Sequence, residues 1–292
     1  MPRPARELEI TVELVTRLLQ AQAPSLADRR PIFEAEGWDN VMFRLGDDLA
    51  VRLPRRQLGA DLLAVEHRWL ETAAAGIGLE VPRHVVIGAP AEGYPWRWSV
   101  VTWIAGEAAD EEPSGSAQMA GLADALTALH RPAPDDAPIS PFRGSPLEGR
   151  RDAAEARAAR VSELNPEAGR TLWTAWREAA ELPAPAPARW IHGDLHPGNL
   201  IVRAGRLVGI IDWGDLGAGD PATDLAVAYH LLEEPGDRHA FLNACGADGQ
   251  TRLRARGWAA HIALALFEAG DPRHDKLARR ITRRLRQELR PR

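Results

Sequence analysis

The sequence predicts an α+β fold with two lobes: a small N-terminal lobe built on an antiparallel sheet and a larger C-terminal lobe that is mostly helical. Strand-like and helix-like segments alternate over the first hundred residues, whereas the pattern is helical from Asp220 onward. A chain of 292 residues that is 45% hydrophobic can bury a large core. We expect the first lobe to cover residues 1–104 and the second to cover residues 105–292.

The N-terminal lobe is predicted to run as helix, two strands, helix, two strands. Helical spacing or short runs of apolar side chains, separated by Gly, Asp and Pro, define these segments. They are a helix over 6–22, strands over 41–45 and 49–53 joined by a Gly-Asp-Asp turn, a helix over 58–76, and strands over 81–87 and 98–104. The chain should cross into the second lobe near residues 102–106.

The C-terminal lobe is predicted to consist of helices around one strand-bearing motif. The expected segments are a polar loop at 107–116, a helix at 117–130, a Pro-rich connection at 132–146, a helical region over about 150–181 with a potential break at Pro166, and helices from Asp220. The stretch LPAPAPA is an extended linker that leads into the motif.

Composition narrows the classes of protein that this chain can belong to. Its apolar runs are far shorter than a membrane span, and the opening MPRPARELEI has no apolar signal-peptide region. Cys245 is the single cysteine, so no intrachain disulfide is possible and a reducing compartment fits. We expect a cytoplasmic protein that does not associate with membranes.

Charge is unevenly distributed along the chain. Residues 271–292 carry nine basic and three acidic side chains, although the whole chain has a net charge of −5. A basic tail is compatible with nucleic-acid binding. However, Leu277, Ile281, Leu285 and Leu289 are spaced as on an amphipathic helix with a solvated Arg face, so we expect no nucleic-acid partner. The acidic remainder suits a cationic small substrate. Monomer and homodimer both stay open.

The stretch WIHGDLHPGNLIVRAGRLVGIIDWGD carries the polar side chains with the clearest chemical potential. Apolar residues on both sides of RAGR predict a hairpin, and Pro197 and Gly198 confine the preceding segment to a loop. The hairpin should bring Asp194, Asn199 and Asp212 together at the edge of a core.

Three interpretations of this stretch compete. Its polar residues can simply form loop hydrogen bonds. His192, Asp194 and His196 alternate and could ligate a transition metal, as in a metallohydrolase, but further ligands are not evident. In phosphoryl transfer, one carboxylate orients and deprotonates a hydroxyl, while an amide and a second carboxylate hold Mg²⁺ on nucleotide phosphates. The interval of five from Asp194 to Asn199 matches that of the kinase catalytic loop H-R-D-L-x-x-x-N.

HGDLHPGN followed by IIDWGDLGAGDPATDLA closely resembles the aminoglycoside phosphotransferase and choline kinase family, whose members are relatives of the protein kinases. GWDNVMFRLGDDLAVRLPRR resembles the N-terminal lobe of that family, and the resemblance is weakest at 107–185 and after about 235. It implies a bilobal protein-kinase-like fold and transfer of the γ-phosphate of ATP or GTP to a hydroxyl of a small molecule, with Mg²⁺ as cofactor.

The resemblance also implies roles for the motif residues. Asp194 is expected to be the catalytic base, and Asn199 and Asp212 are expected to bind Mg²⁺. Three further residues are expected to order and brace the catalytic loop: His192, Asp220 and Asp224.

In the N-terminal lobe, the residue that neutralises the nucleotide phosphates in this family is usually Lys, and Arg52 occupies the matching position. A guanidinium can contact phosphate oxygens at two points, so the chemistry is retained. Glu66 is the expected ion-pair partner, with Glu71 as the less favoured choice. Four more positions are expected to contact the nucleotide: Gly37 and Asn40 in EGWDN, which lacks the G-x-G-x-x-G pattern, and Thr102 and Ile104 in the interlobe linker.

The expected acceptor is a small hydroxylated molecule. Only eleven residues lie between Asp212 and Asp224, which leaves no long segment on which a peptide could dock. An aminoglycoside or related antibiotic is the leading acceptor. A macrolide, choline, an amino alcohol or a sugar stays open, as does a nucleotide-binding pseudokinase that acts through a partner. The acceptor pocket is expected from the C-terminal helices, with residues from 107–185 and 230–270.

Overall fold

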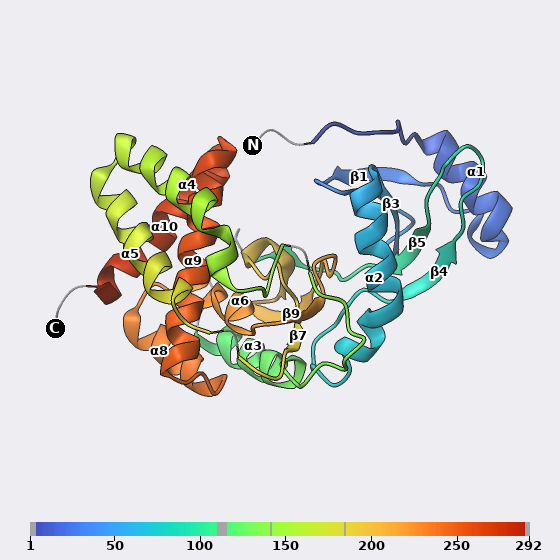
Figure 1. Ribbon diagram of the computed structural model, residues 1–292. Helices are drawn as coiled ribbons and strands as arrows, with labels where there is room; N and C mark the ends of the chain where they lie inside the picture. Colours follow the sequence, from blue (N-terminus) through green and yellow to red (C-terminus); the bar gives the residue numbers. More distant parts are fainter. Residues whose placement is uncertain (1–3, 110–115, 141, 184, 290–292) are drawn as a thin grey trace.

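The computed structural model describes residues 4–109, 116–140, 142–183 and 185–289, and these form two lobes that lie side by side (Figure 1). One lobe is built on a five-stranded antiparallel sheet, and the other is mostly helical. The predicted α+β, two-lobed fold is confirmed. In the described part of the chain, no helix is both long and apolar enough to cross a membrane.

The sheet of the N-terminal lobe has the strand order β1-β2-β3-β5-β4. Its elements are α1 (Val12–Gln22), β1 (Ile32–Glu36), β2 (Asn40–Arg44), β3 (Leu49–Pro54), α2 (Gln57–Ala73), β4 (His84–Gly88) and β5 (Trp98–Thr102). A 3-10 turn, Pro24–Leu26, follows α1. The predicted hairpin is β2 and β3, with Met42 opposite Arg52.

Two differences from the predicted N-terminal lobe have simple physical causes. The edge strand β1 was not predicted. Nearly all residues of its sequence IFEAE are exposed, so the strand has no buried face that would impose a clear alternation of apolar and polar residues. The first helix begins at Val12 rather than at residue 6, because the hydroxyl of Thr11 accepts a hydrogen bond from the N–H of Leu14 and caps the helix there.

The helical lobe surrounds two small sheets. Its helices are α3 (Ser116–Leu129), α4 (Arg151–Leu164), α5 (Pro166–Ala180), α6 (Ala222–Leu225), α7 (Val227–Leu231), α8 (Pro235–Ala244), α9 (Gly249–Ala269) and α10 (Pro272–Leu289). Its strands are β6 (Glu107–Ala108), β7 (Arg189–Ile191), β8 (Leu200–Arg203), β9 (Arg206–Ile210) and β10 (Gly217–Gly219). Leu147–Arg150 and Pro197–Asn199 are 3-10 turns.

The predicted break at Pro166 is present, because Asn165 ends α4 and its side chain caps α5. The predicted polar loop at 107–116 is wrong at its start, where β6 pairs with β8. Residues 110–115 of that loop lie outside the described residues.

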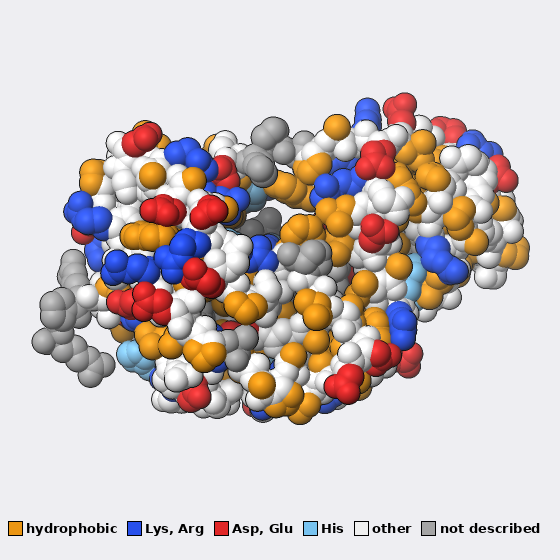
Figure 2. All heavy atoms as spheres, viewed as in Figure 1, with side chains coloured by type: hydrophobic (Ala, Val, Ile, Leu, Met, Phe, Trp, Pro, Cys, Tyr) orange, Lys and Arg blue, Asp and Glu red, His pale blue; other side chains and the backbone are white. Residues whose placement is uncertain are grey.

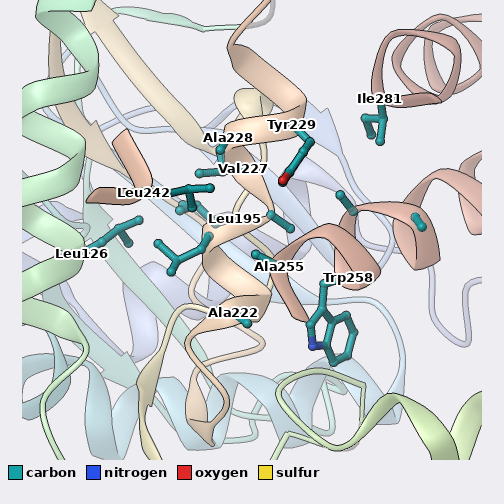
Figure 3. Close-up of a cluster of buried hydrophobic side chains, with 14 of the residues drawn as sticks. Leu126, Leu195, Ala222, Val227, Ala228, Tyr229, Leu242, Ala255, Trp258 and Ile281 are labelled. Carbon is teal, nitrogen blue, oxygen red and sulfur yellow. The ribbon is translucent and has the colours of Figure 1, made fainter. Parts of the chain in front are cut away.

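The large core of the helical lobe anchors the loop that carries Asp194. Leu195, the next residue, is 3% exposed and lies among side chains from the surrounding helices (Figure 3). These include Leu126 of α3, Val227 of α7 and Leu242 of α8. Burial of Leu195 therefore fixes the backbone of the neighbouring Asp194.

The C-terminal helix buries one of the arginines that were expected on its solvated face. Arg284 is 5% exposed, and its guanidinium donates to the carbonyls of Tyr229, His230 and Leu231 in the last turn of α7. These carbonyls have no partners within α7, so a cation at this helix end is stabilising. Arg284 therefore ties α10 to α7.

The expected boundary between residues 104 and 105 stays a prediction. Buried apolar residues form two clusters, and the smaller is made by α1 and the sheet. The larger belongs to the helical lobe, but it includes Leu70, Ala73 and Ala74 from the end of α2 and the following turn. The end of α2 therefore packs on the C-terminal lobe.

Two buried histidines should make the fold sensitive to acid. Burial lowers the pKa of both His230 and His261 to about 3, so both are neutral in the folded protein. The unfolded chain takes up protons below its ordinary histidine pKa of about 6.5, so stability is full above that pH and is lost as pH falls. We expect a loss of up to about 1.4 kcal/mol per histidine for each pH unit between about 6 and 4.

Urea unfolding of the wild type, His261→Gln and the control His239→Gln at several pH values measures this dependence. The control residue lies in α8 and is partly exposed. His261→Gln should flatten the dependence and His239→Gln should not. An unchanged slope in His261→Gln would contradict the assignment.

Candidate active site

The carboxylate of Asp224 in α6 binds the backbone of the loop that carries Asp194. Its two oxygens accept hydrogen bonds from the backbone N–H groups of His192 and Gly193, both at 2.8 Å, and Nε2 of His130 lies 3.0 Å away. This is the bracing contact predicted for Asp224. The same prediction was wrong for Asp220, which precedes α6 and instead accepts from Arg254 of α9 at 2.7 Å.

His192 orders the loop through both ring nitrogens. Nδ1 accepts from the N–H of Asp194 at 3.3 Å, so the ring proton lies on Nε2, which donates to the carbonyl of Ile211 at 3.0 Å. Because the backbone uses both nitrogens, His192 is not free to ligate a metal. Among the described residues, no three His, Cys, Asp or Glu side chains are grouped to hold a metal ion.

Gly193 is required by the close approach of two backbone segments. Its φ is +89°, and a Cβ at this position would lie 2.4 Å from the carbonyl oxygen of Asp215. No side chain fits there. A glycine therefore stands where the protein-kinase motif has arginine.

The two arms of the predicted hairpin bring Asp194, Asn199 and Asp212 to one place. The amide nitrogen of Asn199 donates to the carbonyl of Asp194 at 2.9 Å, and the N–H of Ile211 donates to the carbonyl of Asn199, also at 2.9 Å. Asp212 follows with φ +60°, a left-handed conformation that Asp tolerates better than most residues and that is common at functional sites.

Arg52 of β3 connects this hairpin with the N-terminal lobe. Its Nη1 donates to Oε2 of the fully buried Glu66 in α2 at 2.6 Å, and its Nη2 donates to Oδ1 of Asp212 at 3.2 Å. The predicted Arg52–Glu66 ion pair is thus present, whereas Glu71 is exposed. Between the two lobes the surface is hollowed (Figure 2).

The other predicted nucleotide contacts lie at the start of β2, in the turn before it, at the end of β5 and in the linker that follows. With its amide oxygen turned toward Arg52, Asn40 accepts from Nε at 3.2 Å and from Nη2 at 3.1 Å. Gly37 lies in the β1–β2 turn, where its N–H donates to the carbonyl of Asn40. Thr102 ends β5 and its N–H already donates to the carbonyl of Arg83, whereas Ile104 follows in the linker and is buried.

Three residues of the site were not predicted: Arg143, Ser140 and Asp215. Arg143 donates from Nη2 to Oδ1 of Asp194 at 2.9 Å, and Ser140 donates to Oδ1 of Asp215 at 3.0 Å. Burial alone would raise the pKa of Asp194, but the guanidinium of Arg143 outweighs it and holds the pKa well below its usual range. No sequence motif marks Arg143, because it precedes Asp194 by 51 residues.

Comparison with known proteins assigns the chain to a family. The profile of the phosphotransferase enzyme family matches residues 33–261, which include all of the site residues described above. This chain belongs to the phosphotransferase enzyme family. The match covers both lobes, from β1 in the sheet to His261 in α9.

Two relatives of this phosphotransferase-family chain have related sequences. Aminoglycoside 3'-phosphotransferase from Streptomyces fradiae is 33% identical over 173 residues, which are 53% of this chain and 60% of that protein. The alignment therefore spans less than two thirds of that relative. The uncharacterized protein YcbJ of Bacillus subtilis is 28% identical over 248 residues, or 78% of each chain.

Solved structures share the fold. The GDP and kanamycin complex of APH(2")-IIia superimposes with a TM-score of 0.67 at 18% identity, over 94% of this chain and 99% of that chain. Macrolide 2'-phosphotransferase MphH from Brachybacterium faecium, solved as the apoenzyme, gives a TM-score of 0.60 at 19% identity, over 93% and 97%. These neighbours confirm the kinase-like fold.

Removal of Glu66 should destabilise the protein strongly. Glu66→Ala leaves the buried guanidinium of Arg52 with only its Asn40 and Asp212 contacts, so we expect a loss of about 2–4 kcal/mol in the free energy of unfolding. Glu71→Ala, at an exposed position of the same helix, should cost less than about 0.5 kcal/mol. Chemical denaturation measures both, and equal losses would show that Glu66 does not stabilise the buried charge of Arg52.

Proposed function

We propose that this chain is a small-molecule phosphotransferase that moves the γ-phosphate of ATP or GTP to a hydroxyl group. One observation carries the proposal: elements of both lobes meet at a single point. Arg52, which is paired with Glu66, reaches Asp212. The hairpin arm of Asp212 is bonded to that of Asn199, and Asn199 holds the loop of Asp194. Membership of the phosphotransferase enzyme family supports this assignment.

The N-terminal lobe would bind the nucleotide. Arg52 would contact the α- and β-phosphates, because its guanidinium offers several donors in one plane and Glu66 fixes its orientation. Gly37 and Asn40 lie in and beside the β1–β2 turn that would cover the phosphates. Thr102 and Ile104 would lie along the purine edge. Since the N–H of Thr102 is already bonded, Ile104 is the better candidate donor.

Asn199 and Asp212 fit a magnesium ion, since both offer the hard oxygen atoms that Mg²⁺ prefers. The amide nitrogen of Asn199 is committed to the carbonyl of Asp194, which leaves the amide oxygen as its ligand atom. Asp212 has one carboxylate oxygen on Arg52, and its side chain is 57% exposed, so a nucleotide-bound ion can reach it. When bound, Mg²⁺ would neutralise negative charge on the phosphate oxygens.

Asp194 would act on the acceptor. It is a carboxylate at neutral pH, so it can orient the acceptor hydroxyl and receive its proton as the new bond to phosphorus forms. As the hydroxyl oxygen bonds to the γ-phosphorus, the bond from that phosphorus to the β–γ bridging oxygen breaks. The electron pair of that bond leaves with the nucleoside diphosphate.

An aminoglycoside-type antibiotic is the first acceptor to test. The Streptomyces fradiae relative is an aminoglycoside 3'-phosphotransferase, and solved neighbours include complexes with kanamycin, gentamicin and streptomycin. The net charge of −5 suits a cationic acceptor. A macrolide is the second candidate, because the neighbour MphH is a macrolide 2'-phosphotransferase. Transfer from Mg-ATP and Mg-GTP should be measured on kanamycin, gentamicin, streptomycin, erythromycin, choline and glucose.

Loss of the proposed base should abolish transfer without loss of nucleotide binding. Asp194→Asn should lower kcat by about 10²–10⁴-fold, because the amide cannot accept the hydroxyl proton. The nucleotide KM should change by less than about threefold. The control Asp136→Asn changes an exposed carboxylate on Arg68 and should leave kcat unchanged. Transfer by Asp194→Asn at more than about a tenth of the wild-type rate would show that Asp194 is not the base.

A variant at Asp212 should separate the metal role from the base role. Asp212→Ala should lose most of the thermal stabilisation that Mg-ATP gives the wild type, because one proposed ion ligand is removed. Asp194→Asn should keep that stabilisation. Each shift is measured against the same protein with ATP and EDTA. If both variants keep the magnesium-dependent shift, the proposed ligand is wrong.

A further inference from the structure

Arg143 contacts the proposed catalytic base from a segment that was expected to be only a Pro-rich connection. Its Nη2 donates to Oδ1 of Asp194 at 2.9 Å, and its Nη1 donates to the carbonyl of Phe142 at 3.3 Å. Its Nε is buried and has no hydrogen-bond partner in the described part of the chain. The guanidinium is thus committed mainly to Asp194.

The loop that presents Arg143 is fastened on both sides by backbone hydrogen bonds. The N–H of Ala218 donates to the carbonyl of Pro138 at 2.6 Å, and the N–H of Asp220 donates to the carbonyl of Gly144 at 2.9 Å. Both donors lie in the segment that follows Asp212. The loop therefore belongs to the same framework as the proposed metal ligand.

Ser140 adds a third attachment within the loop. Its hydroxyl donates to Asp215 at 3.0 Å and accepts from the N–H groups of Phe142 and Arg143, both at 3.2 Å. These bonds hold the loop without any help from the Arg143 side chain. The loop thus has attachments that do not involve the Arg143 side chain, whose own main contact is with Asp194.

We infer that Arg143 is a positioning residue for phosphoryl transfer: it binds Oδ1 of Asp194 and so directs Oδ2 to the acceptor hydroxyl. This inference rests on the proposed function. A carboxylate that rotates about its last bond presents either oxygen, and an ion pair at one of them fixes its plane. Nε2 of His196 is 3.9 Å from Oδ2, too far for a hydrogen bond, and no other described side chain donates to Oδ2. Its lone pairs can therefore accept from the hydroxyl of the acceptor.

The test compares Arg143→Ala and Arg143→Lys with the control Arg151→Ala. Arg151 also forms an ion pair, with Glu148 at 2.6 Å, but it lies at the partly exposed start of α4. Transfer is measured on the acceptors named above, with and without added guanidinium chloride at low millimolar concentration. Nucleotide KM and melting temperature are recorded for each variant.

We expect Arg143→Ala to lower kcat by about 100-fold with a nucleotide KM within about threefold of the wild type, because a small misplacement of a reacting group has effects of this size. Guanidinium should restore kcat of Arg143→Ala at least about tenfold, and Arg143→Lys should be intermediate. Arg151→Ala should match the wild type with and without guanidinium.

A kcat of Arg143→Ala within about threefold of the wild type would overturn the inference. So would a loss that guanidinium does not restore and that accompanies a lowered melting temperature, since that pattern marks a structural role. In both cases the wild type still transfers phosphate, so the proposed function stands. A wild type that phosphorylates no acceptor in the panel would instead refute the proposed function and this inference together.

Discussion

The structure depends on a buried guanidinium that both lobes must satisfy. Arg52 is 7% exposed, and a charge in that position is tolerated only if it is paired and hydrogen-bonded. Glu66 pairs with it from the same lobe, and Asp212 pairs with it from the other. The planar guanidinium of Arg52 donates hydrogen bonds to both carboxylates and to the amide oxygen of Asn40 at the same time. A lysine ammonium has fewer donors, and their directions are less fixed. Arg52 thus joins the two lobes through one side chain, in addition to the packing of the end of α2 on the helical lobe.

A second arginine, Arg143, forms a comparable ion pair with the proposed base, Asp194. Arg143 comes from a loop of the helical lobe, whereas Arg52, which forms its ion pair with Asp212, comes from β3 of the N-terminal lobe. The loop that carries Asp194 is held by hydrogen bonds from its backbone to Asp224 and by the burial of Leu195. Each carboxylate of the proposed site is therefore held by a cation from a segment distant in sequence. Such preorganisation reduces the rearrangement needed when a substrate arrives.

The sequence could predict what depends on local spacing. The interval from Asp194 to Asn199, the turn before Asp212 and the break at Pro166 are encoded within a few residues. Glu66 and Glu71 are five apart on one helix, so only one can face β3, and the structure selects Glu66. The apolar periodicity was enough for most elements of the two-lobed fold.

What the sequence could not predict depends on long-range contacts or on exposure. The pairing of Arg143 with Asp194 joins residues 51 apart and has no spacing rule. Hydrophobic periodicity assigns every arginine of α10 to solvent, whereas Arg284 is buried because the open end of α7 offers it three carbonyls. The edge strand β1 is exposed on nearly all of its residues and so lacks a core-facing pattern.

In the proposed function, two hairpin arms and the N-terminal lobe converge on one metal–nucleotide complex. A crystal structure with Mn²⁺ and a non-hydrolysable ATP or GTP analogue tests it most directly, because manganese is located by its anomalous scattering. We expect a peak within coordination distance of the Asn199 amide oxygen and the Asp212 carboxylate, with the phosphates against Arg52. A peak bound by other side chains, or a nucleotide bound away from Arg52, would contradict it.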